Sequence, residues 1–131
     1  MNKARFFIWY WAPPLALMGV IFFLSSRERV GVSDEFVVFF FVFKSLHIIE
    51  YATLQFLVFR ALFRTLSGKN MNRIFLLSFA ITLLYAITDE LHQTMVPTRN
   101  GTIVDIGIDS IGILLSVSYT KLYLERIKRL L

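Results

Sequence analysis

The sequence contains no cysteine, which excludes a disulfide framework and thiol chemistry. Its apolar segments show no internal repeat and no low-complexity linker, and 131 residues are enough for one domain. No A-x-A-like cleavage site follows the first apolar stretch, which is longer than the roughly 7–15 apolar residues of a signal peptide. We therefore expect the first apolar stretch to be an uncleaved helix.

Apolar residues are abundant: they make up 56% of the chain, and 14 of them are phenylalanines. Soluble domains contain about 45–50% apolar residues, and a domain this small buries only about 60–70% of the surface of its chain. Lipid is therefore the predicted solvent. The net charge of +5 then indicates lysines and arginines beside an anionic membrane surface, so membrane lipids are expected partners and nucleic acid is not.

Four apolar stretches are long enough to cross a bilayer, since each has about 18–22 residues at about 1.5 Å per residue. They cover approximately residues 6–24, 45–63, 74–91 and 103–124. Pro13 and Pro14 should kink the first, which membranes tolerate. The apolar run 36–43 is too short to cross and could lie at the interface, re-enter the membrane or extend the second helix. The predicted fold is all-α: one polytopic domain over residues 1–131, with four transmembrane helices in a bundle.

Basic residues are distributed unevenly between the two sides that four spans define. Ten lie on the side of the termini and the middle loop, and four lie on the other side. By the positive-inside rule, this asymmetry predicts cytoplasmic N and C termini. The four on the outer side are Arg27, Arg29, Lys44 and Arg99.

Acidic residues show the opposite distribution. All nine except Glu125 fall in the first outer loop or at the outer ends of the later helices. Glu50, Asp89 and Asp109 would lie about 5–9 Å below the membrane edge at about 1.5 Å per residue. An intramembrane carboxylate costs about 2.5–3.5 kcal/mol and tends to face the bundle or a wet cavity. Three helices with carboxylates at similar depth therefore predict one shared cavity that opens outward.

Spacing places the polar residues of each helix on one face, because residues three and four apart are neighbours on a helix. The groups are His47 with Glu50 and Tyr51, Asp89 with His92 and Gln93, and Asp105 with Asp109. Gly107 and Gly112 are expected to permit close approach of helices. A histidine beside a carboxylate can act as a general acid or base, and Lys44 and Arg99 could hold a phosphate or carboxylate.

Structural explanations of the same residues stay open. Position at a helix end could account for the polar residues of the second and third helices. Asp105 could cap the N-terminus of the fourth. Arg99 could form a purely structural ion pair with Asp89 or Asp105. Ser25 and Ser26 are expected to be ordinary residues at a helix end.

Three segments carry a recognisable pattern: "SS" at Ser25–Ser26, "KSLHIIEYATLQFL" from Lys44, and "YAITDELHQTMVPTRNGTIVDIGIDSIG" from Tyr85. Together they resemble the VanZ-like membrane proteins, which are named for an accessory protein of glycopeptide resistance. The resemblance covers roughly residues 11–115. The positions that match are Lys44, His47, Glu50, Tyr51, Asp89, Glu90, His92, Gln93, Arg99, Asp105, Asp109 and Gly112. Arg27 departs from the pattern, because relatives often carry glutamine there.

The resemblance implies a small multi-pass protein of the bacterial cytoplasmic membrane, and its named member is associated with teicoplanin resistance. Three classes of function are compatible with the residues. The protein could bind or transport an anionic lipid, a lipid-linked envelope precursor or a glycopeptide-related ligand. It could be a membrane-embedded hydrolase or transferase with a His/carboxylate site. It could also be a structural protein whose polar cluster only fixes the bundle.

The candidate site residues follow from the spacing of the polar side chains and from the family resemblance. The candidate catalytic residues are His47, Glu50, Asp89, His92, Asp105 and Asp109. The candidate ligand-binding residues are Lys44, Tyr51, Glu90, Gln93 and Arg99. Histidine and carboxylate side chains suit Zn, Fe or Mn, so a divalent metal is considered as a cofactor, although the spacing matches no specific metal motif.

Overall fold

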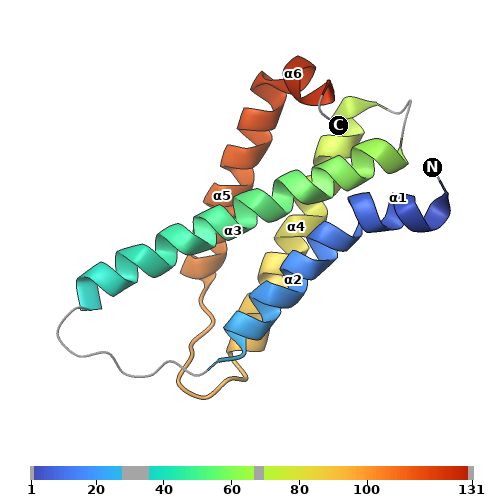
Figure 1. Ribbon diagram of the computed structural model, residues 1–131. Coiled ribbons are helices and arrows are strands. Elements are labelled where there is room, and N and C mark those ends of the chain that lie inside the picture. The colour runs from blue at the N-terminus through green and yellow to red at the C-terminus, as the bar shows by residue number, and fades with distance from the viewer. Residues whose placement is uncertain (1, 28–35, 67–69, 130–131) are drawn as a thin grey trace.

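The structure, a computed structural model, describes residues 2–27, 36–66 and 70–129, and the regular elements among them are helices (Figure 1). The helices are α1 (Lys3–Tyr10), α2 (Ala12–Ser25), α3 (Phe36–Thr65), α4 (Met71–Gln93), α5 (Ile103–Leu122) and α6 (Leu124–Lys128). The all-α prediction is therefore confirmed. Most of the first outer loop, including Arg29, lies outside the described residues.

Three helices are each long and apolar enough to cross a membrane, over Phe41–Thr65, Met71–Gln93 and Ile103–Leu122. The pair α1 and α2 qualifies as a fourth span that is bent by 44°. The chain thus has three membrane-spanning helices, or four when the bent pair is counted as one crossing. The apolar run 36–43 belongs to α3, so it extends the second predicted span, which was one of the three alternatives.

The bend in the first span has a local cause in the two prolines. Pro13 and Pro14 lie in the first turn of α2. Neither has an N–H group, so they cannot donate to the carbonyls four residues earlier, which belong to Trp9 and Tyr10. The Trp9 carbonyl oxygen accepts a hydrogen bond from the Arg60 guanidinium instead. The predicted kink is confirmed. The hydrogen bond from Arg60 to the Trp9 carbonyl oxygen also joins α1 to α3.

The helices form a bundle with two chemically different ends (Figure 1). One end holds α1, α6, the last turn of α3 and the first turn of α4. The other holds the C-terminus of α2, the start of α3 and the α4–α5 connection, and we call it the polar end. The α3 helix packs against α5, α4 and α2, so it is central to the bundle. Both termini lie at the end opposite the polar end, as an even number of crossings requires.

The backbones of α3 and α5 approach each other closely at Gly112. A Cβ atom at this position would lie 2.3 Å from the Ile48 carbonyl oxygen, so only glycine fits. Gly107 is different, because a Cβ there would meet nothing within 4 Å. The expectation of a close helix contact is therefore confirmed at Gly112 and wrong at Gly107.

Candidate functional site

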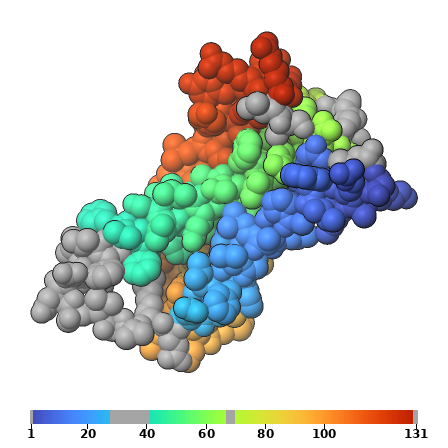
Figure 2. Space-filling view, in the orientation of Figure 1, coloured from blue at the N-terminus to red at the C-terminus, as the bar shows by residue number. Residues whose placement is uncertain are grey.

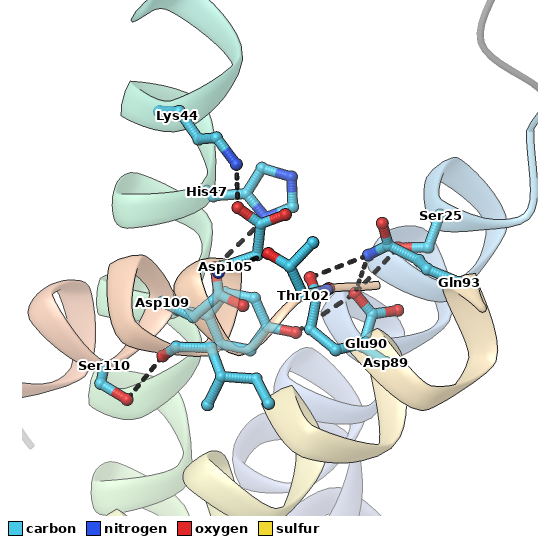
Figure 3. Close-up of polar contacts among 12 residues, drawn as sticks. Ser25, Lys44, His47, Asp89, Glu90, Gln93, Thr102, Asp105, Asp109 and Ser110 are labelled. Carbon is cyan, nitrogen blue, oxygen red and sulfur yellow. Dashed lines mark hydrogen bonds and ion pairs between the residues drawn. The ribbon is translucent and has the colours of Figure 1, made fainter. Parts of the chain in front are cut away.

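Asp89 of α4 is the centre of a buried hydrogen-bond network at the polar end (Figure 3). Its side chain is 2% exposed. Its Oδ2 atom accepts hydrogen bonds from Ser25 Oγ at 2.9 Å and Gln93 Nε2 at 3.0 Å, and a longer one from Tyr51 Oη at 3.4 Å. Its Oδ1 atom is buried and has no hydrogen-bond partner among the described residues. One carboxylate oxygen therefore connects α2, α3 and α4.

The two serines at the end of the first span take part in this network, so the expectation that they are ordinary helix-end residues is wrong. Ser25 donates to Asp89, and Ser26 Oγ lies 3.0 Å from His92 Nε2. Ser26 also donates to the Phe22 carbonyl oxygen at 2.7 Å. Because a hydroxyl has one proton, His92 Nε2 is the donor to Ser26. One feature of the sequence could have indicated these contacts: the two hydroxyl groups lie at the same depth in the first span as the carboxylates in the other spans.

An ion pair and a histidine–carboxylate hydrogen bond join α3 to α5 (Figure 3). Lys44 pairs with Asp105, and about one turn further along both helices His47 Nδ1 lies 3.2 Å from Asp109 Oδ1. Asp109 is 0% exposed, and its Oδ2 atom has no hydrogen-bond partner among the described residues. The spacings of three and four residues place both members of each helix on the face that meets the other helix.

Arg99 in the α4–α5 connection holds the end of α2. Its Nε atom donates to the Arg27 carbonyl oxygen at 2.8 Å, and Nη2 donates to the Leu24 carbonyl oxygen at 3.1 Å. Its Nη1 atom donates to Gln93 Oε1 at 3.2 Å. The carbonyls at the end of a helix lack partners within the helix, and a cation there is favourable. The expected ion pair of Arg99 with Asp89 or Asp105 is not among the ion pairs of the described residues.

Glu90 fixes the α4–α5 connection. Its Oε2 atom accepts from the Thr102 backbone N–H at 3.0 Å, and its Oε1 atom accepts from Gln93 Nε2 at 3.2 Å. The side chain of Thr102 in turn accepts from the Asp105 backbone N–H at 3.1 Å. Thr102 is therefore the N-cap of α5, and Asp105, which was considered for that role, lies in the first turn and pairs with Lys44.

A cavity of about 300 Å³ lies between the end of α2 and the start of α3. Its apolar lining residues are Ile21, Leu24, Phe43 and Leu46, and its polar ones are Ser25, Arg27, His47, Glu50 and Arg99. Of the candidate site residues, His47, Glu50 and Arg99 line it. Asp89, His92, Asp105 and Asp109 lie in the hydrogen-bond network beside it.

The sequence also raised the possibility of a divalent metal. Over the described residues, no three or more His, Asp or Glu side chains are grouped so that they could hold a metal ion. Instead, Asp89 accepts hydrogen bonds from neutral donors such as Ser25, Asp105 pairs with Lys44, and Asp109 contacts His47. The polar end therefore gives no support to a metal-based site within the described part of the chain.

The fold and the polar end together define a multi-pass α-helical membrane protein with a polar site at one end of its bundle. The pattern of the VanZ/LLP1 family matches residues 9–124, which is most of the chain. The chain belongs to the VanZ/LLP1 family, as the resemblance in its sequence implied. No curated protein and no solved structure matches it.

Proposed function

We propose that this VanZ/LLP1-family protein binds an anionic ligand of the cell envelope in the cavity at the polar end. The observation that carries the proposal is the presence of Arg27 and Arg99 in the lining of a cavity within the membrane-spanning bundle. Guanidinium groups hold phosphate and carboxylate oxygens through paired hydrogen bonds. Among the described residues of the lining, the charged side chains are these two arginines and Glu50.

His47 gives the same cavity the potential for proton transfer. An ionised Asp109 can only accept a hydrogen bond, so Nδ1 of His47 carries the proton and Nε2 is left as a base. Nε2 forms no hydrogen bond with a described residue, and His47 lines the cavity. Glu50 lies one turn deeper on the same helix face. This arrangement favours a hydrolase as the second candidate, with His47 as general base.

The ligand-binding proposal is tested by the thermal stability of the purified protein. Glycerol 3-phosphate at millimolar concentration should raise the melting temperature, because a ligand that binds only the native state stabilises it, whereas glycerol should not. N-acetylalanine, a carboxylate, is tested in parallel. Arg27→Gln should weaken phosphate binding about 10–100-fold, since a hydrogen bond to a charged group is worth about 1.5–3 kcal/mol.

Arg73→Gln is the matched control, because Arg73 is exposed in the first turn of α4, at the other end of the bundle. It should keep the full ligand shift. Absence of a shift with both anions, or an unchanged shift in Arg27→Gln, would show the proposal to be wrong. Release of inorganic phosphate in the same samples, lost in His47→Gln, would establish the hydrolase.

We further propose that the polar end faces away from the cytoplasm, in a bacterial cytoplasmic membrane. The excess of basic residues at the other end supports this orientation. Because the chain has no cysteine, single cysteines report on one position each. Thr98→Cys should react with a membrane-impermeant maleimide in intact cells, whereas Lys128→Cys should react only after the membrane is opened. The reverse pattern would invert the orientation, and labelling of both in intact cells would contradict an even number of crossings.

A further inference from the structure

The cavity has a polar side and an apolar side. Arg27, His47 and Arg99 are on the polar side, whereas Leu24, Phe43 and Leu46 contribute hydrocarbon from α2 and α3. These three apolar side chains are 43%, 52% and 45% exposed. They lie on two helices of the membrane-spanning bundle, so the surroundings of their exposed surface are lipid rather than water. The cavity is thus bordered on one side by the bilayer.

At the end of the bundle opposite the cavity, α1 and the residue before α2 are joined to the last part of α3 by two hydrogen bonds. There, Trp11 Nε1 donates to Thr65 Oγ1 at 3.0 Å, and Arg60 donates to the Trp9 carbonyl oxygen. Toward the polar end α2 and α3 diverge, as Figure 1 shows. In the space-filling view of Figure 2 the light-blue end of α2 and the teal start of α3 are likewise apart. The cavity lies between these diverging ends, and the exposed surfaces of Leu24, Phe43 and Leu46 mark its open, apolar side.

We infer that the ligand is a membrane lipid with a phosphate headgroup, which reaches the cavity sideways through the gap between α2 and α3. This inference rests on the proposed function and specifies its ligand. The phosphate binds at Arg27 and Arg99, and the hydrocarbon chain stays between Leu24 of α2 and Leu46 of α3. Anionic lipids of the bilayer carry their charge on phosphate, which is the group that guanidinium binds in paired fashion.

The size of the cavity agrees with this division of the ligand. Ligand-binding cavities have volumes of about 300–1,000 Å³, and this one, at about 300 Å³, is at the small end. It has room for a headgroup but not for the full-length chains of a membrane lipid. A lipid can therefore be bound only if its chains leave through an apolar opening, and the gap bordered by Leu24 and Leu46 is such an opening.

The test compares a lipid with its own headgroup. The full-length protein is placed in nanodiscs of phosphatidylcholine, and its melting temperature is measured with phosphatidic acid in the bilayer or with glycerol 3-phosphate in the buffer. Leu46→Trp narrows the gap from α3, and Leu24→Trp narrows it from α2. Leu84→Trp is the matched control, because Leu84 is 62% exposed on α4 and does not line the cavity.

We expect phosphatidic acid and glycerol 3-phosphate both to stabilise the unsubstituted protein and Leu84→Trp. Leu46→Trp and Leu24→Trp should each bind phosphatidic acid at least about ten-fold more weakly, which is a loss of about 1.4 kcal/mol of binding free energy. Both should keep the shift in melting temperature that glycerol 3-phosphate causes. An unchanged phosphatidic acid shift in both variants would overturn the lateral route, and so would the loss of both shifts in both variants. If only glycerol 3-phosphate stabilises the unsubstituted protein, the lipid inference is wrong and the proposed function stands. If neither ligand does, the lipid inference is wrong, and so is the proposed function unless N-acetylalanine stabilises the protein.

Discussion

Replacement of Gly112 by alanine should destabilise the protein, whereas the same replacement at Gly107, on the same helix, should not. The new Cβ at Gly112 would lie 2.3 Å from the Ile48 carbonyl oxygen, which is backbone and cannot rotate away. Overpacking of this kind costs about 1–3 kcal/mol or more. At Gly107 nothing lies within 4 Å of the added methyl group, so only the higher helix propensity of alanine acts, a gain of about 0.8–1 kcal/mol.

The gain in helix propensity is common to both variants, so their unfolding free energies should differ by the overpacking cost of about 1–3 kcal/mol or more, and melting in one detergent measures the difference. A second effect concerns the site. If α5 moves away from α3 in Gly112→Ala, the Lys44–Asp105 ion pair and the His47–Asp109 hydrogen bond must both lengthen, and the second of these orients His47. Gly112→Ala should then also lose the glycerol 3-phosphate shift, and Gly107→Ala should keep it. Equal melting temperatures for the two variants would contradict the close contact at Gly112.

Asp89→Ala should have the largest effect among the polar residues. The substitution removes the acceptor of Ser25, Gln93 and Tyr51 at a position that is 2% exposed. Each buried donor left without a partner costs about 1–3 kcal/mol. Relief of the buried charge offsets part of this cost, so we expect a net loss of about 2–4 kcal/mol. Thr88→Ala is the control, because Thr88 is exposed and bonds only to the backbone of its own helix, at Tyr85.

Asp89→Asn separates the role of the shape from the role of the charge. The amide oxygen can take the place of Oδ2 and accept the same donors, while the amide nitrogen takes the place of Oδ1, which has no partner among the described residues. The Asp89→Asn variant should therefore have an unfolding free energy at least about 2 kcal/mol higher than that of Asp89→Ala. If the site acts through the charge of Asp89, Asp89→Asn should melt almost like the unsubstituted protein and lose ligand binding. A lower melting temperature with full ligand binding would show that Asp89 only supports the bundle.

The sequence was sufficient to predict the helices of the fold and the end at which the polar residues gather. Periodic spacing places His47 with Glu50, and Asp105 with Asp109, on single helix faces, and lipid restricts those faces to the inside of the bundle. The partners across helices could not be predicted in this way. Whether Asp109 meets His47 depends on the rotation and axial shift of α5 against α3, and neither is encoded in one helix alone.

The remaining errors have similar causes. Small residues permit close helix contact but do not require it, so the sequence alone does not show which of Gly107 and Gly112 lies at a close helix contact. The serines at the end of α2 look like ordinary helix-end residues until α4 brings Asp89 beside them. Arg99 was assigned carboxylate partners because of its charge, but the carbonyl oxygens at the end of α2 are nearer. Each of these contacts joins segments far apart in the chain.

The dependence of α2 on Arg99 sets an order of assembly. The carbonyl oxygens of Leu24 and Arg27 are 75 and 72 residues from the guanidinium that satisfies them, and the partner of Ser25 is 64 residues away. During synthesis α2 precedes these partners into the membrane. The Leu24 carbonyl also accepts from the Arg27 backbone N–H, but the Ser25 hydroxyl and the Arg27 carbonyl lack these distant partners until α4 and the α4–α5 connection have been made, and such contacts form slowly. The helix that is synthesised early is completed late, and the cavity beside it exists only once the chain beyond Arg99 has been inserted.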